Sequence, residues 1–157
     1  MEMNLLMDSG VRFSPCGLYR YTLFREWDGN KPTLAMVLLN PSKATDVISD
    51  PTVTRCLRRA VGMGFGRLEV LNIFAYRSTN PSVLYTINDP IGPENDAYIE
   101  YITSSAEMVI IGWGTHGKLL NRGTQVLQLL RESGVQPMAL KLNKDGKTPA
   151  HPLYISY

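Results

Sequence analysis

Short apolar runs alternate with amphipathic segments along the chain, and this pattern predicts a sheet covered by helices. The apolar runs occupy residues 35–39, 68–71 and 108–111, and they lack the 3.6-residue period of a helix. Short runs rich in branched side chains are typical of strands that are buried on both faces. Helical patterns lie between the runs, so we expect the strands to be parallel.

Turn and capping signals predict where the elements begin and end. Alternating residues over 19–27 meet the turn Asp28-Gly29-Asn30-Lys31, which predicts a hairpin whose second strand covers 33–39. Asp50 and Pro51 are typical of a helix start, and that helix should end near Val61. The remaining expected elements are a strand over 68–72, a helix from 92–96 to about Ser105, a strand over 108–113, a helix over 123–133 and a strand over 137–142.

These elements predict a single three-layer α/β/α domain over residues 1–157. We expect a central, mostly parallel four-stranded sheet with an antiparallel hairpin at its N-terminal side. The chain of 157 residues is 44% hydrophobic and 19% charged, which suffices for one domain with an ordinary core.

Charge and composition narrow the functional classes. The net charge of +2 is too small to establish a nucleic-acid partner. We interpret the basic cluster at Arg55, Arg58, Arg59 and Arg67 as a solvated helix face. Two cysteines and two histidines, without ligand spacing, predict neither a metal nor another cofactor. Without a signal peptide or an 18-residue apolar run, we expect a cytoplasmic protein with no membrane contact, and a monomer.

Polar residues follow each of the three buried strands at the point where the strand ends. Parallel strands share one carboxyl edge, and ligands of open α/β sheets bind along that edge. We therefore predict one crevice there. Its candidate residues are Asn40, Ser42, Asp46, Asn72, Phe74, Trp113 and His116. A further candidate is His151, which the adjacent Pro152 holds in a short, stiff segment.

The side chains at this edge suit the recognition of a nucleobase. Asn40 can present its amide to a water or ligand, with Asp46 or Asp50 nearby as a base. Asn72 offers a donor and an acceptor side by side, as the edge of a base requires. Phe74 is near enough to stack on a ring. Each residue also has a structural interpretation: a turn, a loop cap, core packing or a helix cap.

In their order along the chain, four segments resemble the motifs of the uracil-DNA glycosylase superfamily. They are Leu38-Leu39-Asn40-Pro41-Ser42, Val70-Leu71-Asn72, Ile111-Gly112-Trp113-Gly114-Thr115-His116 and Ala150-His151-Pro152-Leu153. The similarity spans about residues 34–155 and implies a uracil-DNA glycosylase-like fold.

A closer resemblance is to an uncharacterised family of bacterial and phage proteins, domain of unknown function 1643, which brings no known activity. The segments that carry it are Leu39-Asn40-Pro41-Ser42, Asp50-Pro51-Thr52, Gly92-Pro93-Glu94-Asn95-Asp96 and His151-Pro152-Leu153-Tyr154.

The glycosylase resemblance implies metal-independent hydrolysis of an N-glycosidic bond to a uracil-like or modified base. In that reaction Asn40 would hold the water, His151, aided by His116, would donate to the leaving base, and Asn72 would read the base edge. The alternative is a protein that binds a nucleotide or nucleic acid without cleaving it. A structural or partner-binding protein, such as a phage factor, is a third interpretation.

Overall fold

The computed structural model describes residues 7–157, and within them one mixed sheet of six strands forms the centre of the molecule. The strands lie in the order β1-β2-β4-β3-β5-β6. Their bounds are β1 Asp8–Phe13, β2 Arg20–Glu26, β3 Thr33–Leu38, β4 Arg67–Asn72, β5 Met108–Ile111 and β6 Met138–Ala139. β4, β3, β5 and β6 are mutually parallel, so the predicted parallel unit is present within a larger sheet of six strands instead of four.

The predicted hairpin between residues 19–27 and 33–39 is wrong. β2 pairs antiparallel with β1 and with β4, and β3 lies on the far side of β4. The start of β4 enters between the two strands, where the Gly66 carbonyl accepts from the N–H groups of Trp27 and Asp28 at 2.9 and 3.1 Å. A Cβ on Gly66 would lie 1.9 Å from the Asp28 carbonyl oxygen, so this close approach requires glycine.

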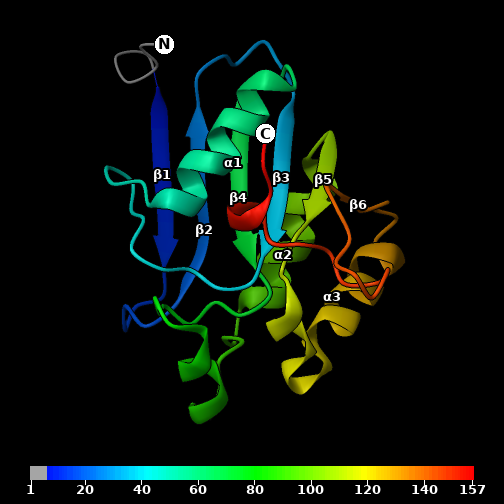
Figure 1. Cartoon of the computed structure of the whole chain (residues 1–157). Coiled ribbons are helices and arrows are strands. Elements are labelled where there is room, and N and C mark those ends of the chain that lie inside the picture. Colours follow the sequence, from blue (N-terminus) through cyan, green and yellow to red (C-terminus); the bar gives the residue numbers. More distant parts are fainter. Residues whose placement is uncertain (1–6) are drawn as a thin grey trace.

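Helices cover both faces of the sheet, which gives the predicted three layers (Figure 1). One face packs against α1 (Pro51–Gly62) through Val53, Cys56 and Ala60. The other face packs against α2 (Asn95–Ser105) and α3 (Arg122–Glu132). Three short 3-10 helices complete the fold: η1 (Pro81–Thr86), η2 (Thr115–Asn121) and η3 (Pro152–Tyr154).

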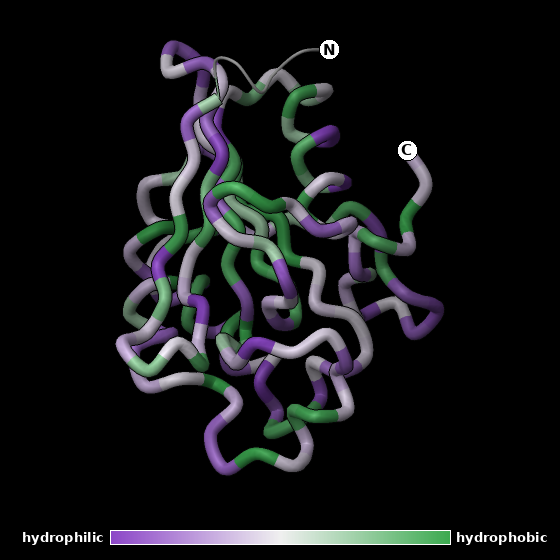
Figure 2. Tube along the Cα trace, turned by 90° about the vertical axis from the view of Figure 1, so that its left-hand side faces the viewer, coloured by the Kyte–Doolittle hydropathy of each residue, from purple (hydrophilic) through white to green (hydrophobic). Residues whose placement is uncertain are grey.

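The distribution of hydropathy follows this layering. In Figure 2 the central strands are largely hydrophobic, whereas the connecting loops are mixed or hydrophilic. Leu34, Met36 and Val37 of β3 are fully buried because both faces of that strand are covered. None of the helices within residues 7–157 has the length and apolar character needed to span a bilayer.

The start of α1 confirms the capping signal read from the sequence. Asp50 accepts a hydrogen bond from the Val53 N–H at 2.9 Å, and Pro51 occupies the first helical position. This cap places Asp50 and the first turn of α1 near the carboxyl edge of the parallel strands. The helix start therefore takes part in the crevice at that edge.

Candidate functional site

A cleft of about 1010 Å³ lies at the carboxyl edge of β3 and β5. Its walls come from five segments: residues 39–42, the start of α1, residues 78–81, residues 113–116, and a long stretch between 141 and 155. Figure 1 shows the C-terminal segment, in red, crossing in front of the sheet beside α1. Five of the predicted residues line the cleft: Asn40, Ser42, Trp113, His116 and His151.

His151 is a neutral hydrogen-bond donor in this cleft. Burial lowers its pKa to about 4, and the nearby carboxylate of Asp50 opposes that shift only in part. The Leu153 N–H donates to His151 Nδ1 at 3.2 Å, so Nδ1 is the acceptor and the single ring proton lies on Nε2. The Pro152 ring that follows restricts the backbone of this short turn. The imidazole therefore offers one N–H without carrying charge at neutral pH.

Asn40 is held in a defined orientation at the end of β3. Its Nδ2 donates to the Ser78 carbonyl at 2.8 Å and to the Pro41 carbonyl at 3.1 Å. Both amide hydrogens are thus engaged by the protein, and the Oδ1 acceptor is left for a water or a ligand donor. The predicted use of Asn40 toward a water requires such an acceptor, although an amide cannot take up a proton.

The carboxylate in the cleft is Asp50, and the expected placement of Asp46 is wrong. Asp50 lines the cleft from the start of α1, whereas Asp46 is exposed on the loop between β3 and α1 and is absent from the cleft walls. The Asp46 carbonyl accepts from the Ser9 hydroxyl at 2.6 Å, which ties this part of the loop to β1. The helix cap, a signal visible in the sequence, is what brings Asp50 to the site.

Asn72 and Phe74 do not reach the cleft, so their expected placement there is wrong. Asn72 pairs with Leu38 in the parallel register, two residues before Asn40, and is 2% exposed inside the sheet. Its buried Nδ2 has no hydrogen-bond partner within residues 7–157. Phe74 is fully buried in the core beneath α2 and α3. Neither side chain can touch a base in this conformation.

Trp113 forms a wall of the cleft by packing, as its structural interpretation predicts. It is 5% exposed, and two glycines lie against its indole ring. A Cβ on Gly117 would lie 2.3 Å from Trp113 Cδ1, and one on Gly123 would lie 2.7 Å from Nε1. The close backbone approach expected around this tryptophan therefore comes from η2 and α3.

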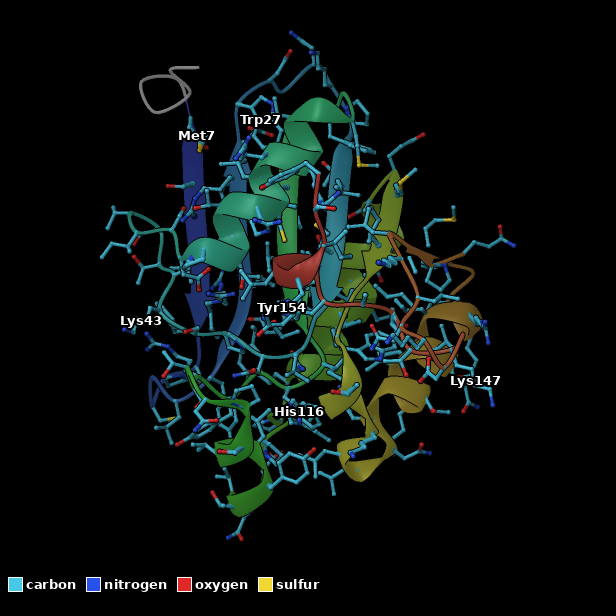
Figure 3. The ribbon with its side chains drawn as sticks, viewed as in Figure 1. Met7, Trp27, Lys43, His116, Lys147 and Tyr154 are labelled. Carbon is cyan, nitrogen blue, oxygen red and sulfur yellow. The ribbon has the colours of Figure 1, made fainter. Side chains whose placement is uncertain are left out.

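Half-buried His116 and exposed Tyr154 also line the cleft and supply aromatic surface and hydrogen bonds. His116 Nδ1 lies 3.0 Å from the Tyr85 hydroxyl, which joins η2 to η1. Tyr154 is 84% exposed, and its ring centroid lies 5.9 Å from that of His151. Figure 3 shows Tyr154 and His116 at the same end of the sheet. Sequence reasoning placed Tyr154 in a motif without giving it a role, and it did not consider two lysines, Lys141 and Lys144, that also line the cleft.

The basic cluster read from the sequence does not form one solvated face. Arg55 donates to the carbonyls of Pro152 and Ile155 at 3.3 and 2.5 Å, and Arg59 donates to those of Ile155 and Ser156 at 3.0 and 2.9 Å. Arg67 instead pairs with Glu26 and Glu69 on the sheet. Two of the arginines on α1 therefore hold the turn that carries His151.

Within residues 7–157, no group of three His, Cys, Asp or Glu side chains is arranged to hold a metal ion. The chemistry available on the described walls is that of one carboxylate, two amides, two imidazoles, hydroxyl groups and lysines. Such a set can bind a heterocycle, orient a water and donate to developing negative charge.

Comparisons with known proteins identify a family and no activity. A family model described as "Protein of unknown function (DUF1643)" matches residues 20–153, which includes nearly all of the cleft walls. No curated protein and no solved structure matches the chain. The resemblance to uracil-DNA glycosylases thus rests on its short motifs alone.

Proposed function

The chain belongs to the family described as a protein of unknown function (DUF1643), and we propose that it recognises a nucleobase in the cleft and hydrolyses the N-glycosidic bond of a uracil-like or modified base. The observation that carries the proposal is the neutral, oriented imidazole of His151 in a cleft that also holds the carboxylate of Asp50.

His151 has the properties that a departing base needs from its surroundings. When an N-glycosidic bond breaks, the bonding electrons move onto the base, and negative charge grows on its carbonyl oxygen. The Nε2–H of the neutral ring is held in place and can donate a hydrogen bond to that oxygen. A charged imidazolium would need a partner for its charge, and the neutral ring needs none. A single preorganised donor of this kind accounts for about 10²–10³ in rate.

Asp50 and Asn40 suit the activation of water. The Asn40 Oδ1 can accept from a water and orient it, while the Asp50 carboxylate can take up the proton that the water loses as it adds to the sugar carbon. Asp50 uses Oδ1 to cap α1, which leaves its second oxygen for this purpose. The carboxylate that position 40 lacks thus comes from the neighbouring segment.

Tyr154 is the ring that suits stacking on the base, in place of Phe74. Its exposed ring lies beside His151 on the same turn. Stacking on an aromatic side chain contributes about 1–3 kcal/mol per base and does not depend on base identity. Specificity would then come from hydrogen bonds to the base edge by His151, His116 and the polar groups of the walls.

A second candidate function is binding of a nucleotide or nucleic acid without cleavage. One observation favours it: Asn40 is an amide, and the only carboxylate on the described cleft walls already caps a helix. In such a protein the same side chains would recognise the base, and His151 would contribute to affinity instead of rate.

The test is incubation with oligonucleotides that carry uracil, modified pyrimidines or mismatches, single-stranded and duplex, followed by detection of abasic sites. We expect abasic product with the unmodified protein and a loss of about 10²–10³ in single-turnover rate for His151→Ala, with little change in the dissociation constant. If the protein binds strands but forms abasic product on none of them, the glycosylase proposal is dropped and the binding function is kept. No binding to any strand would end the glycosylase proposal and would leave only the binding of a free nucleotide.

A further inference from the structure

A second pocket of about 460 Å³ adjoins the cleft and is basic. Ser42, Ser78 and Thr79 line both cavities, so these residues form the partition between them. The partition is held by hydrogen bonds: the Ser78 N–H donates to the Pro41 carbonyl at 2.9 Å, and the Asn40 amide donates to the Ser78 carbonyl at 2.8 Å. A ligand in the cleft can therefore reach the second pocket across a short, ordered wall.

The polar side chains of this pocket can all donate hydrogen bonds, and none of them is acidic. Lys43 and Arg77 line it together with the hydroxyl groups of Ser42 and Thr79. Figure 3 shows Lys43 on the loop that follows β3, at the same end of the sheet as His116 and Tyr154. Within residues 7–157 neither Lys43 nor Arg77 forms an ion pair with a carboxylate. Hydroxyl, ammonium and guanidinium donors together are typical of phosphate sites.

The guanidinium of Arg77 is held in a defined orientation, but not all of its N–H donors have a hydrogen-bond partner. Its Nη1 donates to the Gly17 carbonyl at 3.1 Å, and its guanidinium lies over the Phe13 ring at 4.5 Å. The buried Nε has no hydrogen-bond partner within the described chain. A guanidinium carries five N–H donors, so the Nη groups keep donors for a ligand besides the one that Gly17 accepts. Stacking on Phe13 holds the planar group in place at low entropic cost.

Two further guanidinium groups lie beneath the loop that carries Lys43. Arg20 and Arg25 are 2% and 3% exposed, and they donate to backbone carbonyls of Ala44, Thr45 and Ile48. Burial lowers the pKa of Arg20 to about 10, which still leaves it charged at neutral pH. Asp46 and Asp50 offset this charge only at longer range. The loop thus lies over buried positive charge, which favours an anion on its outer side.

We propose that this pocket binds the phosphate attached to the nucleoside whose base lies in the cleft. The inference rests on the proposed function, since the cleft must hold the base. The shared chemistry is a phosphate ester, and its source is either a free nucleotide or the backbone of a strand. In both cases Lys43 and Arg77 supply charge, and Ser42 and Thr79 supply hydroxyl donors.

Calorimetry with three probes tests this inference: deoxyuridine, deoxyuridine 5′-monophosphate and a uracil-containing single-stranded pentamer. We expect the phosphate to raise affinity about tenfold over the nucleoside. Lys43→Gln should weaken binding of the phosphorylated probes about threefold to tenfold and leave deoxyuridine unchanged. For the pentamer, the slope of log affinity against log salt should fall by about one. If only the monophosphate binds more tightly than deoxyuridine, the ligand is a free nucleotide. If the pentamer also binds more tightly, the ligand is a strand.

Lys31→Gln is the matched control, because Lys31 is exposed beside Asp28 in the turn between β2 and β3 and lines neither cavity. It should change none of the three affinities. Arg77→Gln, checked for folding by thermal denaturation, should match or exceed the effect of Lys43→Gln. Equal affinity for nucleoside and nucleotide would overturn the inference while the proposed function stands. If Lys43→Gln and Arg77→Gln both keep the higher affinity for the phosphorylated probes, the inference is also overturned. If no probe binds, both the inference and the proposed function are overturned.

Discussion

At the scale of single residues, His151 and Asp50 define the chemistry of the cleft, and each has two tasks. His151 starts η3 by accepting from the Leu153 N–H, and the same contact leaves its proton on Nε2. Asp50 starts α1 by accepting from the Val53 N–H, and it also lines the cleft as a carboxylate. Because these structural and chemical tasks use different atoms, substitutions can separate them.

The first prediction concerns the charge of His151. Its pKa of about 4 in the folded protein lies below its ordinary value of 6.5, because burial disfavours the charged ring. The unfolded chain therefore binds more protons between pH 4 and 6.5, and His151 should reduce stability as the pH falls through that window. Following the ring resonances of His151 by NMR should give a midpoint near pH 4. A midpoint near 6.5 in the folded protein would contradict the neutral-donor mechanism.

The second prediction separates the cap of Asp50 from its carboxylate. Asp50→Asn keeps a side-chain oxygen for the Val53 N–H, so the free energy of unfolding should change little, whereas Asp50→Ala should cost about 1 kcal/mol. Both variants remove the base, so cleavage should slow by about 10²–10⁴ in each. Asp46→Asn, on the exposed loop, is the control and should preserve both quantities. Full activity in Asp50→Asn would exclude Asp50 as the base.

At the scale of elements, α1 acts as a support for the turn that carries His151. Arg55 and Arg59, on one face of the helix, donate four hydrogen bonds to the three carbonyls of Pro152, Ile155 and Ser156. Their guanidinium groups also lie within 4.8 and 5.0 Å of the Tyr157 ring centroid. Hydrogen bonds from charged donors are stronger than neutral ones. Through these bonds α1 holds a segment that lies about one hundred residues later in the chain.

The third prediction tests this support. Arg55→Gln removes two charge-assisted hydrogen bonds and should lower the free energy of unfolding by about 1–3 kcal/mol. Hydrogen exchange at the Leu153 amide should become faster, because the η3 turn opens more often. Arg58→Gln is the matched control: Arg58 is exposed and contacts the Tyr157 ring at 4.4 Å, but it holds none of these carbonyls. Equal exchange rates in both variants would show that Arg55 does not position the turn.

At the scale of the whole molecule, the cleft exists because layers on opposite sides of the sheet meet at one edge. α1 and the C-terminal segment contribute from one side, and η2 contributes from the other. Trp113 lies between them, with Gly117 and Gly123 packed on its ring. Packing at native density leaves no room for an added methyl group there, so these glycines set how closely α3 approaches the sheet edge.

The fourth prediction concerns that approach. Gly123→Ala would bring a methyl group to 2.7 Å from Trp113 Nε1, so the indole or α3 must shift. We expect a loss of about 1–3 kcal/mol in the free energy of unfolding, together with a change in tryptophan fluorescence as the indole moves. Gly62→Ala at the end of α1 is the control, since an added Cβ meets nothing within 4 Å. That variant should be as stable as the unmodified protein or slightly more stable.

Several features of the protein follow from the sequence alone because they depend on neighbouring residues. Branched apolar runs predict buried strands, and the Asp50-Pro51 pair predicts the start of α1; both are observed. The rule that parallel strands share a carboxyl edge placed Asn40, Trp113 and His116 at one crevice, and all three line the cleft. These inferences succeed because periodicity, capping and strand direction are local properties or follow directly from them.

Only the tertiary structure decided the features that depend on contacts between distant segments. β4 entered between β2 and β3, which no local turn signal encodes, and its register buried Asn72 two positions inside the edge. The choice of Asp50 over Asp46 depends on which part of one loop faces the cleft. The lowered pKa of His151 and the basic pocket at Lys43 and Arg77 come from burial and from segments far apart in the sequence. Strand order, burial and the proximity of charges are set by how the elements pack, so they required the folded chain.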